Sequence, residues 1–306
     1  MNFLKNALRP AANSVRRFIR NSVPPSTLDP DSIAQQVQRT IVNQYRSFSI
    51  DGVAPYSSIR EAGFRVYSQF EEDGIILYVL SMIGIKTRRV VELCCGNGSE
   101  CMAANLIINH GFDGYLFDGG AENIKSAQEF FGKKRDCLAY SPNLSQAWVT
   151  AENVNDLLIG SGCGGEVDLL SLDLDGNDYW IWQAIDVIRP RLLVLETHNI
   201  IPSDKSLTIR YDPNFYCWDK PGHEQDYRGV SLLAMQRLCR RKGYRMIGAH
   251  RLGFNVLFLK DGEGEAFFPE VGIAEIHDNH WTRSGQKDRW PLVKDMPWVE
   301  VEVPPS

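Results

Sequence analysis

The sequence predicts an α/β fold with a Rossmann-like sheet that is mostly parallel, ends in an antiparallel hairpin and carries helices on both faces. Short apolar runs alternate with helical stretches through residues 88–241, which is typical of strand–helix units in a parallel sheet. Two further apolar runs lie within residues 244–259 and are joined by a short turn, so we expect them to pair antiparallel. A turn with two glycines follows the first run, where the backbone can let a ligand approach.

Each expected strand is a run of apolar residues of the length usual for buried strands. The first five runs should form parallel strands and the last two the hairpin. The runs are residues 90–93, 115–118, 137–140, 167–173, 192–195, 244–248 and 255–259.

The glycine turn and the acid that ends the second strand indicate a nucleoside-binding unit. Gly96 and Gly98 follow the first strand, and Asp118 ends the second. The N-terminus of the helix offers free N–H groups, and the acid can accept hydrogen bonds from a ribose. A dinucleotide site requires a third glycine where Cys101 stands. S-adenosyl-L-methionine has no pyrophosphate and does not need that glycine, and Glu92 at the end of the first strand suits it.

A second group of polar residues follows the fourth and fifth strands. Asp173, Asp175 and Asp178 lie within six residues, and Glu196 and His198 come after the next strand. Neighbouring carboxylates repel one another unless a cation, a proton or ligand donors offset them. Ligands of open α/β sheets sit at this end of the strands. We take Asp173, Asp175 and His198 as catalytic candidates. A divalent cation held by Asp173, Asp175 and Glu196 or His198 is an alternative, but no separated ligand set is evident and we assign no metal ligand.

Composition limits the classes of protein to which the chain can belong. A chain of 306 residues with 43% hydrophobic content can bury a full core, so we expect one domain plus extensions. A net charge of -5 argues against a general nucleic-acid binder. Seven cysteines without paired C-x-x-C motifs favour a reducing, cytoplasmic location. No apolar run reaches the length of a membrane span.

The chain divides into an arm, an extension, a main domain and a tail. The arm has five basic residues and no acid, and its first 20 residues could contact an anionic membrane at its inner face, act as a transit segment or dock to a partner. The insertion in the main domain lacks periodicity, is rich in aromatic residues and is expected to act as a lid. The tail is expected to pack on the body. The boundaries are residues 1–28 for the basic arm, 29–64 for the helical extension, 65–260 for the domain, 200–228 for its insertion and 261–306 for the tail.

Four motifs in this order resemble the FkbM-type family of S-adenosylmethionine-dependent methyltransferases. They lie at residues 68–73, 91–98, 116–118 and 171–178, and the resemblance covers residues 65–260. Five strand–helix steps followed by an antiparallel hairpin are also the plan of class I methyltransferases. The nicotinamide Rossmann plan instead ends in a sixth parallel strand. Family members often act in polysaccharide and glycolipid biosynthesis, so the resemblance implies O-methylation of a hydroxyl on a sugar or glycan acceptor.

The resemblance also implies roles for individual residues. The glycine turn and Glu92 would cradle the methionine part of the cofactor, Asp118 would hold the ribose, and Asp173 would face the amino group or the methyl-transfer site. Residues near the adenine and residues covering the edge of the cofactor complete the expected set. The cofactor-binding candidates are Gln69, Asp73, Glu92, Gly96, Gly98, Asp118, Gly119, Glu152, Asn153 and Asp173.

Two other functions compete with this hypothesis. Cys94 stands where many such loops have their first glycine, which favours a catalytically degenerate methyltransferase fold that acts as a binding or scaffold protein. A nicotinamide-dependent enzyme is a third option, opposed by the missing third glycine and by the terminal hairpin. The sequence leaves the acceptor and the oligomeric state open.

Overall fold

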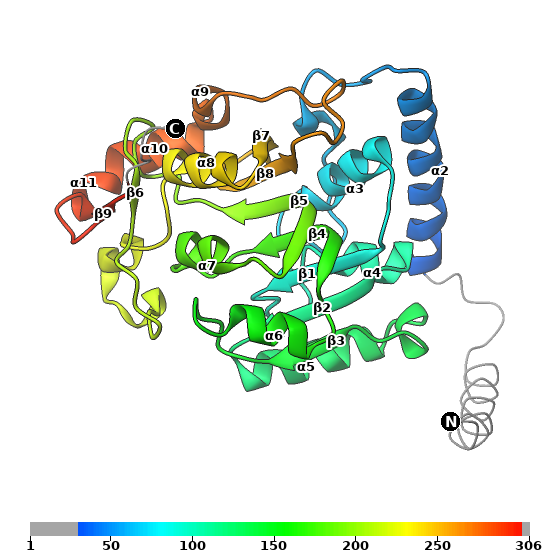
Figure 1. Cartoon of the computed structure of the whole chain (residues 1–306), viewed down its shortest axis with the longest axis horizontal. Coiled ribbons are helices and arrows are strands. Elements are labelled where there is room, and N and C mark those ends of the chain that lie inside the picture. Colours follow the sequence, from blue (N-terminus) through cyan, green and yellow to red (C-terminus); the bar gives the residue numbers. More distant parts are fainter. Residues whose placement is uncertain (1–29, 302–306) are drawn as a thin grey trace. The chain divides into compact units, whose positions relative to one another are not determined.

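The computed structural model describes residues 30–301, and the basic arm therefore lies outside the described residues (Figure 1). The chain divides into two units, residues 1–39 and residues 40–306. The first unit contributes only the beginning of helix α2 (Pro30–Ile50) to the described part. All other described elements belong to the second unit.

One seven-stranded sheet forms the centre of the second unit, in the order β3-β2-β1-β4-β5-β8-β7. The first five strands are parallel, and β8 runs antiparallel to both of its neighbours. The expected fold class, a mostly parallel Rossmann-like sheet with a C-terminal antiparallel hairpin, is confirmed. The strands are β1 (Arg89–Leu93), β2 (Asp113–Asp118), β3 (Asn143–Gln146), β4 (Gly165–Leu172), β5 (Ile188–Glu196), β7 (Tyr244–Ala249) and β8 (Asn255–Lys260).

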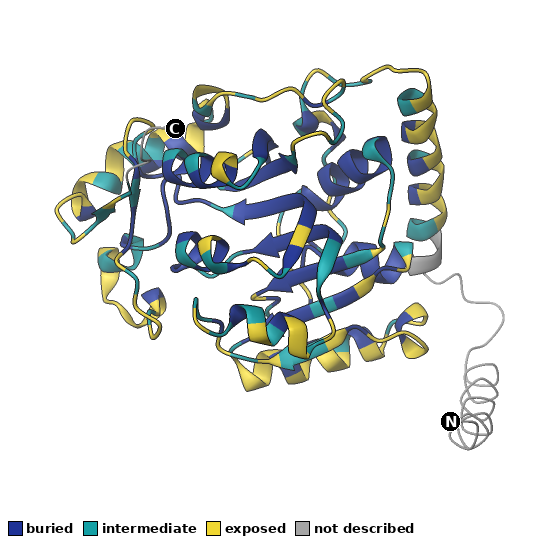
Figure 2. Cartoon of the chain, in the orientation of Figure 1, coloured by how far each residue is buried: buried dark blue, intermediate teal, exposed yellow. Residues whose placement is uncertain are grey.

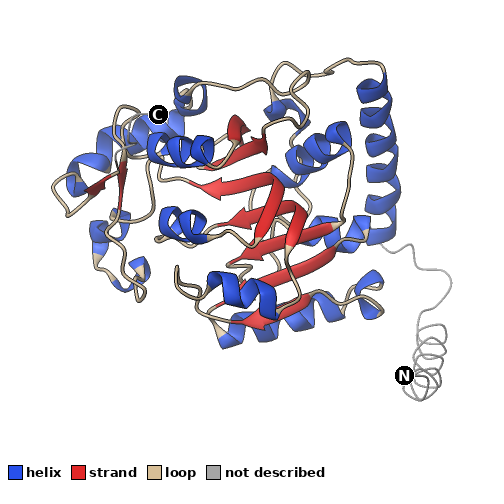
Figure 3. Ribbon diagram, viewed as in Figure 1, coloured by secondary structure: helices blue, strands red, loops and turns tan. Residues whose placement is uncertain are grey.

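Helices cover both faces of the sheet because successive side chains of each buried strand point to opposite faces (Figure 3). In β1, Val90 packs into one hydrophobic cluster and Val91 into the other. The first cluster joins the sheet to α3, α4 and α5, and the second joins it to α6, α7 and α8. Figure 2 shows the strands buried between these layers. These helices are α3 (Glu72–Ile83), α4 (Ala104–His110), α5 (Ala121–Gly132), α6 (Val154–Gly160), α7 (Asp178–Ala184) and α8 (Leu232–Arg241).

The expected third strand at residues 137–140 is wrong. The chain there forms a short 3-10 helix (Asp136–Leu138), and Cys137 is buried in the cluster of α3, α4 and α5. The true third strand, β3, has the polar sequence Asn-Leu-Ser-Gln and lies at the edge of the sheet. An edge strand needs little apolar surface, so its sequence gives no apolar run to detect.

The insertion and the tail form a small two-stranded sheet and a third hydrophobic cluster. Strand β6 (Leu207–Thr208) pairs antiparallel with β9 (Val299–Glu300). The cluster combines residues of both segments, among them Ile209 and Val293. Of the described helices, none has both the length and the hydropathy needed to cross a membrane. The tail helices are α9 (Ile273–His277), α10 (His280–Asp288) and α11 (Trp290–Val293).

Candidate functional site

Two cavities lie where β1, β2 and β4 end, and they share lining residues. Their volumes are about 370 and 310 Å³, and both are lined by Cys94, Asn123 and Asp175. The first extends toward Trp148 and the insertion, and the second extends toward Gln69 and the β1 turn. Because they share these residues, the two cavities adjoin each other at the edge where parallel sheets bind ligands.

The turn after β1 has three residues with positive φ, of which Cys94 and Gly96 line the cavities, whereas Gly98 is absent from their described lining. Cys94, Gly96 and Gly98 have φ angles of 73°, 56° and 84°. A Cβ on Gly98 would lie only 3.0 Å from an atom of the Phe130 ring, so this position needs glycine for space as well as for conformation. Cys94 is the one residue of the three with a side chain, and left-handed backbone costs such a residue about 1–2 kcal/mol.

We therefore predict an order of stability for substitutions at Cys94. Replacement by glycine should leave the free energy of unfolding unchanged or slightly higher, because glycine accepts a φ of 73° without strain. Replacement by valine should lower it by about 2 kcal/mol, because a β-branched residue is the least tolerant of this conformation. Urea unfolding of the three proteins measures the order. A valine variant as stable as the wild type would contradict the strained turn.

Asp118, the last residue of β2, connects the β1 turn to the loop after β2. Its Oδ2 accepts a hydrogen bond from Gly96 N at 2.9 Å. Its Oδ1 accepts from Gly120 N at 2.8 Å and from Asn123 Nδ2 at 3.0 Å. The Cys94 thiol also lies within hydrogen-bond distance of Oδ2, with Sγ at 3.8 Å. These four donors occupy the roughly four acceptor positions of a carboxylate, so a ligand hydroxyl has to replace one of them, and the thiol is the weakest donor. Asp118 shapes the first cavity, and a bond from it to a ligand stays a prediction.

Glu92 lines the second cavity, but its carboxylate is directed into the protein. It accepts hydrogen bonds from Met102 N at 3.0 Å and Ala103 N at 2.7 Å, just before α4 begins. Burial raises the pKa of Glu92 to about 7, although these donors oppose the shift. The structure thus gives Glu92 a supporting role for the loop, and a bond to a ligand remains a prediction.

The upstream motif contributes one cavity residue and one anchor. Gln69 lines the second cavity. Asp73 is buried and accepts backbone hydrogen bonds from Val66, Tyr67 and Ser68 at 2.7, 2.7 and 2.8 Å. It thereby fixes the loop that carries Gln69. Asp73 does not appear among the described lining residues of either cavity.

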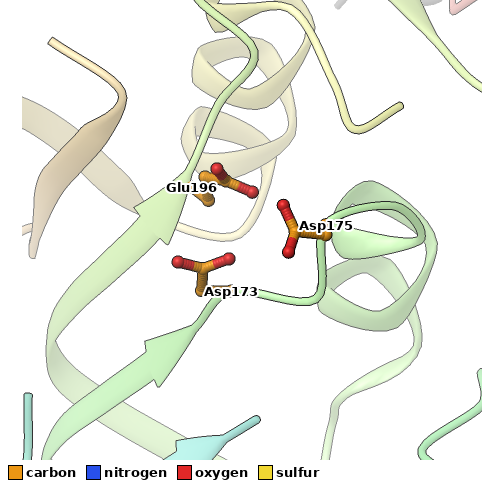
Figure 4. A group of neighbouring side chains, drawn as sticks. All are labelled: Asp173, Asp175 and Glu196. Atoms are coloured by element: carbon orange, nitrogen blue, oxygen red, sulfur yellow. The ribbon is translucent and has the colours of Figure 1, made fainter. Parts of the chain in front are cut away.

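Three carboxylates meet at the ends of β4 and β5 (Figure 4). Asp173, Asp175 and Glu196 have ligand atoms that all lie within 4.8 Å of one another. Burial and the neighbouring carboxylates raise the pKa of Asp173 to about 7, and they raise that of Glu196 well above its usual range. Arg228 offsets part of this charge with an ion pair to Asp175 of 2.6 Å. The three oxygens could also hold a divalent cation. Asp178 instead anchors the loop, accepting from the backbone N–H groups of residues 174 and 176.

His198 is buried and follows the end of β5 by two residues. Its Nε2 donates to the backbone oxygen of Asp226 at 2.8 Å, and burial, with Arg228 and Arg289, lowers its pKa to about 3. It is absent from the described lining residues of both cavities. A base that holds a proton so weakly and uses Nε2 as a donor is poorly placed for catalysis, so the geometry favours Asp173 and Asp175.

Glu152 and Asn153, the two residues expected near the adenine, hold the chain beside the first cavity in place. Asn153 accepts from Thr150 N and donates to the Trp148 backbone oxygen, and Glu152 accepts from the Tyr211 hydroxyl. The described lining of the first cavity contains neither of them. Trp148, four residues earlier than Glu152, lines it directly.

Close packing at Gly119 fits the ring of Trp148 against the end of β2. A Cβ on Gly119 would lie 2.6 Å from Trp148 Cε3. Both residues line the first cavity, together with Val149 and Leu174. Gly119 is thus required for the close approach of an aromatic wall, and its contact with a cofactor stays a prediction.

The insertion forms the remaining wall of the first cavity. Trp148 Nε1 donates to the Pro213 oxygen at 2.6 Å, and Trp218 Nε1 donates to Asp175 Oδ2 at 3.0 Å. These contacts hold the insertion across the ends of the strands. The insertion expected to act as a lid forms this wall, and closure over a ligand stays a prediction. Its aromatic composition was the signal in the sequence, and Phe215, Tyr216 and Trp218 are among the aromatic residues concerned. Other cavity residues that were not site candidates from the sequence include Asn123, Trp148 and Asn177.

No protein-family model and no curated protein matches this chain. The solved structures similar to it include an O-methyltransferase from Bacillus cereus in complex with S-adenosylhomocysteine (SAH), at a TM-score of 0.40 and 11% identity, covering 80% of this chain and 96% of that chain. The plantazolicin methyltransferase BamL, also with SAH, has a TM-score of 0.37 and 14% identity, covering 83% and 92%. An S-adenosylmethionine-dependent methyltransferase from Clostridium acetobutylicum has a TM-score of 0.37 and 11% identity, and the match covers 60% of this chain and 88% of that chain. These neighbours are described as methyltransferases, but similarity at this level carries no argument about the function of this chain.

Proposed function

We propose that the protein is a S-adenosylmethionine-dependent methyltransferase that methylates a hydroxyl on a sugar or on a polysaccharide or glycolipid acceptor. The observation that supports it best is the pair of adjoining cavities at which the β1 turn, Asp118 and the carboxylates after β4 meet. The glycan acceptor rests on the FkbM-type resemblance. We place the enzyme in the cytoplasm, where its basic arm would give peripheral contact with a membrane.

The residues of the site fit this cofactor in three respects. Trp148, Val149 and Leu174 give the first cavity the apolar walls that a nucleobase requires. Asn177 Oδ1 is buried on the same side and has no hydrogen-bond partner among the described residues, which leaves an acceptor for a ligand N–H. We expect Asp118 to accept a ribose hydroxyl in place of the weakly donating Cys94 thiol, whose Sγ lies 3.8 Å from Oδ2.

The second cavity suits the methionine part and the transfer step. Gln69, Glu92 and Asp173 line it. The Glu92 carboxylate is used on the backbone N–H groups before α4, so we expect the Asp173 carboxylate to accept from the cofactor's ammonium group. When bound, the cofactor supplies a methyl group on a sulfonium, which is electrophilic without further activation. The protein then has to align the acceptor and remove its proton. We expect Asp175, which lines both cavities beside Asp173, to accept that proton, while Asp173 positions the ligand.

Calorimetric titration with SAH, and with NAD as the control ligand, tests the proposal. We expect SAH to bind with a dissociation constant on the order of micromolar and NAD not to bind. The glycine turn lacks the third glycine of a dinucleotide site, which is the reason for the difference. Binding of NAD alone would reassign the site to a nicotinamide cofactor.

A degenerate methyltransferase fold that serves as a binding or scaffold protein is the second candidate. The strained Cys94 in the ligand-binding turn is the observation that favours it. Folded protein that binds neither SAH nor NAD would support this alternative over the enzyme.

A further inference from the structure

The insertion supplies charged and aromatic groups to the proposed site through a short stretch around Arg228. Arg228 Nη1 donates to Asp175 Oδ1 at 2.6 Å, and its guanidinium carbon lies 4.9 Å from the centre of the Trp218 ring. Trp218 in turn donates to the other oxygen of Asp175. The positions of Asp175 and of the aromatic wall therefore depend on where the backbone of residues 226–228 lies.

That backbone is held from two sides. On the side of the sheet, His198 Nε2 donates to the Asp226 oxygen at 2.8 Å. On the side of the tail, the Arg289 guanidinium forms a two-pronged ion pair with the Asp226 carboxylate, with Nε 2.9 Å from Oδ2. Such bidentate pairs fix orientation as well as distance. Asp226 is thus the residue through which Arg289 of the tail binds the insertion.

Further residues of the tail also contact the insertion. The Tyr227 hydroxyl donates to the Pro297 oxygen at 2.9 Å, and the Tyr227 ring lies 4.7 Å from that of Trp298. Strand β9 then pairs with β6 at the other end of the insertion, and Val301 N donates to the Ser206 oxygen at 2.9 Å. Figure 1 shows β6 and β9 side by side. The insertion is therefore tied to residues 289–301 at both of its ends.

We propose that Arg289 is a positioning residue for the ligand site and that the C-terminal segment of residues 289–301 completes its wall. The ion pair with Arg289 holds Asp226 in place, and the position of Asp226 fixes the backbone that carries Arg228. Arg228 in turn holds Asp175 and Trp218 at the cavities. The proposal rests on the proposed function, since the affected site is the same. The proposal therefore gives the tail a role in ligand binding in addition to its contribution to the stability of the fold.

The test compares Arg289→Ala with Arg283→Ala. Arg283 lies in the same tail, on α10, and pairs with Asp278, but the two side chains are 60% and 78% exposed, so this pair is expected to contribute little. Hydrogen exchange of residues 209–228 is measured first, because it needs no ligand. We expect faster exchange in this segment for Arg289→Ala alone, with β4 and β5 unchanged.

The second readout is SAH affinity by calorimetry, at a temperature well below the melting transition of both variants. We expect about tenfold weaker binding for Arg289→Ala, an affinity close to wild type for Arg283→Ala, and partial recovery for Arg289→Lys. A purely structural pair would change the melting temperature without this change in affinity. If Arg289→Ala does not fold, Asp226→Asn takes its place in both measurements.

The outcomes separate this inference from the proposed function. Wild-type protein that does not bind SAH refutes the function, and with it the inference about binding, while the exchange measurement still reports whether the tail orders the insertion. Binding by the wild type, with equal affinities for the Arg289 and Arg283 variants, overturns the positioning role and leaves the function standing. Faster exchange together with weakened SAH binding supports it.

Discussion

Replacing Asp118 by alanine is expected to weaken SAH binding about 100-fold, or about 2.7 kcal/mol. The change removes the proposed ribose acceptor and also the acceptor for Gly96 N, Gly120 N and Asn123 Nδ2. The β1 turn and the loop after β2 would then lose the side chain that accepts hydrogen bonds from both of them. Calorimetric titration of the folded variant measures the loss.

The matched control is Asp113→Ala. Asp113 begins the same strand, β2, at the end away from the cavities, and it is exposed. Its replacement should leave SAH affinity within about twofold of wild type. Circular dichroism and a melting curve establish that both variants fold. An Asp118 variant that binds SAH as tightly as the Asp113 variant would remove Asp118 from the binding site.

The parts of the site that the sequence predicted follow from the parallel strand order. Gly96, Asp118 and Asp173 lie at or shortly after the carboxyl ends of three strands, and parallel strands bring these ends to one edge. Register is strongly specified where strands are buried on both faces, so these residues had to meet. Apolar runs predicted β1, β2 and β4 to within a few residues.

The wall of the first cavity could not be predicted in the same way. Trp148 follows β3, whose polar edge-strand sequence gave no apolar run, and the misplaced strand at residues 137–140 put the rim at the wrong position. Trp148 Nε1 bonds to Pro213, 65 residues later, within an insertion without periodicity. The conformation of such a segment is set by long-range contacts that local sequence does not encode.

The directions of the polar side chains near the site also could not be predicted from the sequence. Asp73 and Asn153 are polar residues near the expected edge, yet each uses its oxygen on nearby backbone N–H groups. Asp and Asn often make such local bonds, which stabilise turns. A polar residue at the carboxyl end of a strand is thus predicted to lie near the site. Only the folded structure shows whether its hydrogen-bond partner is a ligand or the backbone.

The largest effect on stability is expected from Asp168, at the opposite end of β4 from the cavities. Asp168 is fully buried and accepts from the backbone N–H groups of Lys86, Thr87 and Arg88 at 3.0, 2.8 and 2.7 Å. It also pairs with the fully buried Arg191 at 2.7 Å. The carboxylate thereby joins β4 and β5 to the chain that enters β1.

Asp168→Ala is expected to lower the free energy of unfolding by about 3–5 kcal/mol. The variant would leave backbone donors unsatisfied and would remove one of two carboxylates that offset the buried Arg191, the other being Glu263 at 2.7 Å. Breaking one side of a buried pair is costly because the remaining charge keeps its desolvation penalty. A loss of this size is a large part of the total stability of about 5–15 kcal/mol usual for proteins.

Glu166→Ala is the control for this prediction, since Glu166 lies in the same strand and its ion pair with Lys260, at 4.0 Å, is partly exposed. Its loss should cost less than about 0.5 kcal/mol. Urea unfolding of both variants gives the comparison, and Asp168→Asn, which keeps one acceptor, should fall between them. Equal stability of the Asp168 and Glu166 alanine variants would show that water or a rearranged Glu263 satisfies Arg191, and that the carboxylate does not organise this end of the sheet.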